Sequence, residues 1–200
     1  MAADVRQILR EVERLIATLE SMPDEEIAKA AGSYINYLYN VDIRRVRAEL
    51  PGYLKGYEAF RDGSVNGIAG IIPPSTDRHV KEAFGYFSSL AGMVESRFYR
   101  DGTYVGSQLS SKAEHERWYR EFRGMLANTL TEAITAYRAV KGNLTALSKD
   151  FLVGGQVKKA LAQYGLSLSD LPSVDSLVRA ANKLVSVYDA YEKAEIGKYH

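Results

Sequence analysis

The sequence predicts an all-α protein with seven or eight amphipathic helices in a bundle-like arrangement. Apolar residues recur with the i, i+3, i+4 spacing of a helix along almost the whole chain. Glycine and proline gather at a few places that separate these periodic segments, and only Tyr104–Val105 is expected to be briefly extended. No period of about 34 to 45 residues recurs, which argues against an array of helical repeats.

The first 61 residues are expected to form an N-terminal helical arm or subdomain. Pro23 should end the first helix, and three acidic residues after it suit the positive end of the second helix dipole. Pro51–Gly52 is expected to break the chain once more. The predicted elements are helices at Asp4–Ser21, Asp24–Asn40 and Asp42–Leu50, then a segment that carries Leu54, Tyr57 and Phe60.

Residues 62–75 read DGSVNGIAGIIPPS and are predicted to form a long flexible loop. Three glycines and two adjacent prolines fit poorly inside a regular helix, and long loops in compact domains are usually functional or flexible. A phosphate-binding loop is not expected, because no Gly-Lys-Ser/Thr follows the glycines and no strand precedes them.

Residues 76–200 are expected to form the main helical bundle, although the whole chain could also form a single domain. Ser111 and Glu114 have the spacing of a capping box, and Gly165 should cap the C-terminus of a later helix. Gly142 is expected to close the longest helix. The predicted helices begin at Ser75 or Thr76 and at Ser111, and then cover Asn143–Leu152, Gln156–Tyr164 and Ser173–Ala194.

Composition excludes several classes of function. The chain has fourteen tyrosines, three histidines and no cysteine, so disulfides, thiolate nucleophiles and zinc–thiolate sites are ruled out. Its 26 basic and 25 acidic residues leave a formal charge of +1, which means that a nucleic-acid surface would have to be a local patch. We expect neither a secretory signal nor a membrane span, because no window approaches the roughly 18–20 apolar residues that a span needs.

The histidines do not form a catalytic or metal-binding motif. A di-iron bundle needs Glu-x-x-His, but the residues three before His79 and His115 are Thr76 and Lys112. His79 and Glu82 are one turn apart and could share a helix face, yet a solvated histidine is the favoured interpretation. His115 is expected to be exposed in a first helical turn. We therefore expect no enzyme, no metal and no cofactor; an enzyme that uses Tyr and Arg around a buried pocket is the weakest alternative.

Tyrosines interleaved with cations form the candidate site. Guanidinium groups suit phosphates, and tyrosine offers a stacking face and a hydroxyl donor. The alternatives are that the tyrosine rings lie buried at helix seams while the arginines face solvent, or that the patch binds protein. Tyr99 and Tyr119 mark a weaker second patch. The predicted nucleic-acid-binding residues are Arg44, Arg45, Arg47, Lys55, Arg61, Tyr37, Tyr39, Tyr53 and Tyr57.

Gln156–Ser169 reads QVKKALAQYGLSLS and is followed by an apolar helix with Tyr188 and Tyr191. This stretch resembles one in the helical capsid proteins of archaeal rod-shaped and filamentous viruses. The resemblance implies a helical protein that polymerises around double-stranded DNA, wraps it with an N-terminal helical arm and contacts phosphates without reading bases.

These observations predict a non-catalytic structural protein, namely a self-assembling capsid or nucleoprotein subunit of a virion that coats double-stranded DNA through Arg/Lys–phosphate contacts. Its expected partners are further copies of itself or a related subunit, and DNA. The alternative is a cytoplasmic helical adaptor or regulator that binds another protein through a Tyr/Arg-rich surface.

Overall fold

The computed structural model describes residues 5–40, 43–62, 72–107 and 109–200, and it confirms the all-α prediction. Seven α-helices, one 3₁₀-helix and one small hairpin make up the described part of the chain. The elements are α1 (Val5–Ser21), α2 (Asp24–Asn40), α3 (Ile43–Arg61), α4 (Thr76–Phe98), β1 (Tyr99–Arg100), β2 (Thr103–Tyr104), α5 (Lys112–Ser148), α6 (Gly154–Gln163), η1 (Leu168–Asp170) and α7 (Val174–Tyr199).

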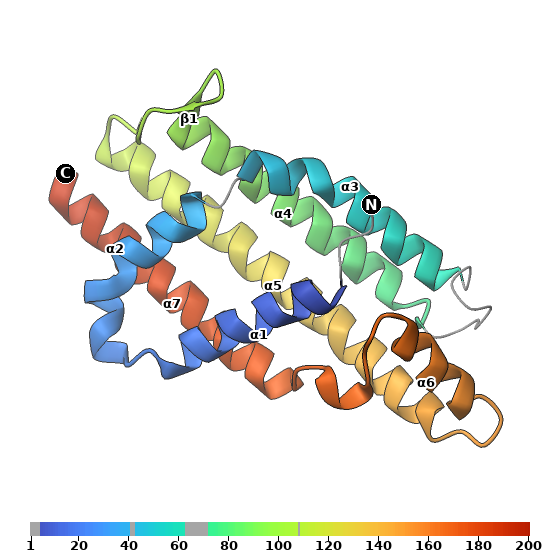
Figure 1. The fold of residues 1–200 in the computed structure, drawn as a ribbon. Coiled ribbons are helices and arrows are strands. Elements are labelled where there is room, and N and C mark those ends of the chain that lie inside the picture. Colours follow the sequence, from blue (N-terminus) through green and yellow to red (C-terminus); the bar gives the residue numbers. More distant parts are fainter. Residues whose placement is uncertain (1–4, 41–42, 63–71, 108) are drawn as a thin grey trace.

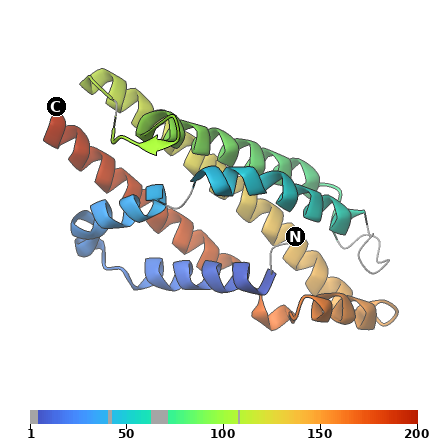
Figure 2. The same cartoon turned by 45° about the horizontal axis from the view of Figure 1, so that its top comes forward.

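The bundle is elongated along its longest helix, α5, which has 37 residues and is therefore about 55 Å long. Helices α4 and α7 flank α5, while α3 packs on α4, and α1 and α2 pack on α7 (Figures 1 and 2). Helix α6 lies at the C-terminal end of α5. The chain exposes 11608 Å², whereas a compact protein of 22.2 kDa exposes about 9,400 Å².

Three apolar clusters hold the helices together. The largest joins α2, α4, α5 and α7, and Phe122 lies inside it with its ring centroid 4.7 Å from those of both Trp118 and Tyr188. A second cluster lies beneath α6 and a third between α1 and α7. The apolar stripes expected from the sequence supply these residues, so the periodicity correctly indicates which helix faces are buried.

The predicted helix breaks at Pro51 and Gly142 are wrong. Helix α3 runs through Pro51 without a break, with half-buried Leu50 and Leu54 on either side of the proline. Helix α5 runs through Gly142 to Ser148, because the residues beyond the glycine pack in the cluster under α6. A glycine inside a helix costs only about 1 kcal/mol, which the burial of one leucine offsets.

The predicted caps at Ser111 and Gly165 are confirmed, whereas α6 begins at Gly154 and α7 runs to Tyr199, beyond the predicted end at Ala194. The Ser111 hydroxyl accepts a hydrogen bond from the Glu114 amide at 3.1 Å, although the Glu114 carboxylate turns to Ser110 and the predicted capping box is half formed. Gly165 ends α6 with a positive φ of 68°. Asp101 and Gly102 both have positive φ, as a tight hairpin turn between β1 and β2 requires. The predicted loop at 62–75 falls mainly on residues 63–71, which lie outside the described residues.

Candidate functional site

The five predicted cations all lie on α3, which carries five basic and two acidic side chains, a net charge of +3. Arg44, Arg45, Arg47 and Lys55 are exposed, and Arg61 is half-buried. Because Arg44 and Arg61 are seventeen residues apart, the cations are spread over about 25 Å of helix rather than gathered at one point. Such a row could follow a backbone of phosphates but could not enclose a small anion.

Several of these cations already contact groups of the same chain. Arg47 NH1 lies 2.6 Å from Glu95 Oε2 on α4, and Arg45 NH1 lies 3.6 Å from Glu49 Oε1 one turn along α3. The Arg44 guanidinium lies over the Tyr99 ring at 5.8 Å from its centroid. Phosphates would therefore have to compete with carboxylates for Arg45 and Arg47.

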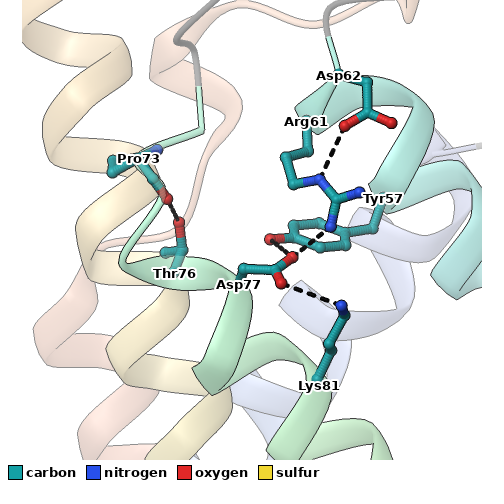
Figure 3. A network of polar contacts seen from close by, with 7 residues as sticks. All are labelled: Tyr57, Arg61, Asp62, Pro73, Thr76, Asp77 and Lys81. Carbon is teal, nitrogen blue, oxygen red and sulfur yellow. Dashed lines mark hydrogen bonds and ion pairs between the residues drawn. The ribbon is translucent and has the colours of Figure 1, made fainter.

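Arg61 and Tyr57 belong to a polar network that fastens the end of α3 to the start of α4 (Figure 3). Asp77 Oδ1 accepts from Arg61 NH1 at 2.5 Å and from the Tyr57 hydroxyl at 3.2 Å, while Lys81 Nζ lies 3.1 Å from Asp77 Oδ2. Hydrogen bonds from Arg61 and then Lys81 hold the pKa of Asp77 below its usual value. Asp77 also sits in the first turn of α4, where the helix dipole favours a negative charge. Two of the predicted binding residues thus make contacts between helices.

Several of the described tyrosines bond to protein groups. Tyr39 is buried and donates to Glu192 at 3.1 Å, and exposed Tyr53 donates to Glu49 at 3.3 Å. In the second predicted patch, the Tyr119 hydroxyl donates to Asp189 Oδ1 at 2.6 Å, and the Tyr99 hydroxyl lies 3.4 Å from the Tyr39 carbonyl oxygen. The side chain of Tyr37 lies outside the described residues. The hydroxyls of Tyr39, Tyr99 and Tyr119 therefore link different elements of the fold, whereas that of Tyr53 bonds within α3.

Burial of these tyrosines predicts a two-stage alkaline titration. Desolvation raises the pKa of Tyr57, Tyr119 and Tyr137 from 10.0 to about 12, and it raises those of Tyr39 and Tyr188 further. A raised pKa means that the folded state favours the neutral phenol, and this preference adds to the free energy of unfolding. The added stability is complete at a pH below the tyrosine pKa of the unfolded chain, about 10, and is lost as the pH rises through the tyrosine pKa values of the folded chain. We expect tyrosinate absorbance to rise in two stages. Part of the fourteen tyrosines should ionise reversibly near pH 10 with the helices intact, and the others should ionise at higher pH, together with loss of helix. Ionisation of all fourteen near pH 10 with the helices intact would contradict this.

A buried cluster of charged residues lies where α2, α4, α5 and α7 meet, and sequence reasoning missed it. The Glu192 carboxylate is fully buried and accepts from Arg97 NH1 at 2.7 Å, from His115 Nε2 at 2.7 Å and from Tyr39. The Arg97 guanidinium lies 4.3 Å from the Trp118 ring centroid. A carboxylate only accepts, so the shorter contact to Glu192 requires a proton on His115 Nε2, and the Arg97 Nη2 group 3.2 Å from the same nitrogen is then a second donor beside it. Arg97 and Glu192 occupy the apolar stripes of α4 and α7, and charged residues at such positions are the signal in the sequence that could have revealed the cluster.

The expected exposure of His115 is therefore wrong. The histidine does lie in the first turn of α5, but Arg97 of α4 and Glu192 of α7 cover it, and the His200 ring contacts it edge-on at 5.4 Å. None of the residues of the buried cluster lines the cavity between α3, α4 and α5 or the groove between α5 and α7. We interpret the cluster as a polar core that fixes how the four helices pair.

Two cavities lie elsewhere in the bundle. A cavity of 420 Å³ between α3, α4 and α5 is apolar apart from the hydroxyls of Tyr57 and Tyr137, which donate to Asp77 and to the Pro172 carbonyl oxygen. A groove of 260 Å³ between α5 and α7 is lined by aliphatic side chains, threonines, Asn182 and Arg138. Neither lining, among the residues that the structure describes, offers a carboxylate or histidine that could act as a general base.

None of the described helices is long and apolar enough to cross a membrane.

Comparisons with known proteins found no relative of this chain. The chain matches no protein-family model, no curated protein and no solved structure. The function has to be inferred from the chemistry of the surface and the core.

Proposed function

We propose that this chain is a non-catalytic structural protein that assembles end to end with further copies of itself. The observation that carries the proposal is the distribution of exposed apolar side chains. Among the described residues, seven large hydrophobic side chains are exposed, and five of them belong to the two ends of the elongated bundle.

The two ends carry different apolar groups. At one end the hairpin exposes Tyr104 and Val105, and the last turn of α7 exposes Tyr199. The hairpin and the end of α7 lie at the same end of the bundle (Figure 1). At the other end, the turn between α5 and α6 presents Phe151 at 99% and Leu152 at 82% exposure. This turn is ordered, because Asp150 Oδ1 accepts from the amides of Leu152 and Val153 at 2.8 and 3.1 Å.

An apolar patch at each end of a rod favours a head-to-tail contact. Burying apolar surface contributes about 25 cal/mol per Å², so the fully exposed Phe151 ring has most to gain from a partner. A contact between two different patches of the same chain is heterologous, and such contacts build open filaments unless a rotation closes a ring. The large exposed area of the chain also supports a subunit that buries surface on assembly.

Sedimentation velocity and negative-stain electron microscopy over a range of concentrations test this assembly. We expect species larger than the 22.2-kDa monomer that grow with concentration and appear as filaments. The double variant Phe151→Ser/Leu152→Ser should shift the distribution to monomer, because its end patch is polar. The matched control Ile8→Ser, which changes an exposed apolar residue on the side of the bundle, should assemble normally. A wild-type chain that stays monomeric at every concentration would exclude the proposal.

Coating of double-stranded DNA is the second candidate, and the net charge of +3 on α3 favours it. The same preparations with duplex DNA at two salt concentrations decide it. If Arg44, Arg45 and Lys55 neutralise three phosphates, replacing them with alanine should reduce the slope of log K against log salt by about 2.7. Replacing the exposed lysines Lys158 and Lys159 of α6 with alanine is the matched control. Weak, salt-insensitive binding excludes DNA coating, and discrete oligomers without DNA affinity favour the adaptor alternative.

A further inference from the structure

Three potential metal ligands converge where α4 and α5 lie side by side. His79 and Glu82 come from α4, and Glu132 comes from α5. His79 Nδ1 contacts Glu132 Oε2, and one ligating atom from each of the three residues lies within 4.8 Å of the other two. The spacing of His79 and Glu82 in the sequence gives one helix face, and the antiparallel packing of α5 supplies the third ligand.

The charges in this cluster favour a cation. One carboxylate oxygen of Glu82 and one of Glu132 lie within 4.8 Å of each other, and two ionised carboxylates at that separation repel. The nearby Arg78 offsets part of this negative charge. A divalent ion between the carboxylates would offset the rest and would remove the repulsion.

We propose that His79, Glu82 and Glu132 bind a divalent transition-metal ion, with Zn²⁺ as the expected one. One imidazole nitrogen and two carboxylate oxygens form a ligand set that zinc accepts. Tetrahedral zinc with bonds of about 2.0–2.2 Å places two donor atoms about 3.3–3.6 Å apart. The three donor atoms lie within 4.8 Å of one another, so side-chain rotations that move them by about 1 Å are needed, and exposed Glu82 has room for such a rotation. His79 and Glu132 are half-buried, whereas the side of Glu82 is open, which leaves room for water as a fourth ligand.

A metal here would act as a cross-link between two long helices. It would tie the first two turns of α4 to the middle of α5, close to the apolar cavity between α3, α4 and α5. Binding to the folded chain alone raises its stability, so the ion should increase the melting temperature as well as bind.

Isothermal titration calorimetry with ZnCl₂ on the metal-free full chain tests the site. We expect one Zn²⁺ per chain. His79→Ala and Glu132→Gln should each weaken Zn²⁺ binding at least about 10–100-fold, because replacing even a residue that only hydrogen-bonds to a metal ligand has an effect of that size. His200→Ala removes an exposed histidine that is not one of the three proposed ligands, and this variant should bind Zn²⁺ as the wild type does. Circular dichroism on each variant establishes that it is folded.

A second measurement keeps the test independent of folding defects in the variants. Addition of ZnCl₂ should raise the melting temperature of the wild-type chain, and EDTA should reverse the rise. Glu82→Gln, at the exposed position of the trio, should weaken both binding and the thermal shift. Absence of Zn²⁺ binding to the wild type, or equal binding by wild type and His79→Ala, would overturn the proposal.

Discussion

Glu192→Ala is expected to lower the free energy of unfolding by about 3–5 kcal/mol, the usual effect of breaking a buried ion pair by removing one partner. Glu192 has no exposed surface and accepts hydrogen bonds from Arg97, His115 and Tyr39. Alanine would leave the Arg97 guanidinium charged in a buried site without its carboxylate. Arginine cannot escape this by losing its proton, because a guanidinium group stays protonated in proteins.

Urea unfolding followed by circular dichroism measures the effect, and Glu121→Ala is the matched control. Glu121 is exposed on α5, so its change should stay within about 0.5 kcal/mol. The double variant Arg97→Ala/Glu192→Ala should lower the free energy of unfolding by less than the sum of the two single changes. In the double variant neither Arg97 nor Glu192 remains as an unpaired buried charge. Additive effects, or a Glu192→Ala variant as stable as the control, would show that the cluster does not act as a unit.

The buried faces of the helices could be predicted from the sequence because burial leaves a periodic trace in a single segment. Ile16 and Leu19 follow the apolar stripe of α1 and are buried against Ala180 of α7. The path of the chain through Pro51 and Gly142 could not be predicted, because the local costs of about 3 kcal/mol for a proline and about 1 kcal/mol for a glycine are of a size that packing can offset. That packing depends on helices distant in the sequence.

The polar contacts also divide into a part that one segment of the sequence predicts and a part that depends on helices distant in the sequence. The sequence marks Arg61 and Tyr57 as chemically notable, but their partner Asp77 lies beyond a loop, at the start of the next helix. Likewise, the His79–Glu82 spacing indicates a shared face, whereas Glu132 joins them from 53 residues away in the chain. One helix can be predicted from its own residues, but a cluster built from two or more helices requires their register.

Phe122→Ala is expected to destabilise the fold by about 3–5 kcal/mol, through lost burial and the cavity that remains. The Phe122 ring is buried, stacks on Trp118 with an angle of 16° between the planes, and meets the Tyr39 ring edge-on at 6.2 Å. It therefore touches aromatic rings of α2, α5 and α7 at once. Neighbouring rings are too rigid to fill the space of a lost phenyl group, so most of the cavity should persist.

Thermal unfolding at low protein concentration separates this effect from assembly, and Phe151→Ala is the control because it makes the same change at a fully exposed ring. For a chain of this size each kcal/mol lowers the melting temperature by about 2–4 °C, so Phe122→Ala should melt at least about 6 °C below the wild type. Phe151→Ala should melt within about 2 °C of it, since it removes no buried contact. If both variants melted together, the aromatic cluster around Phe122 would not be the centre of the core. If Phe151→Ala alone lost the concentration-dependent species, the exposed end of the bundle would serve assembly while Phe122 serves the fold.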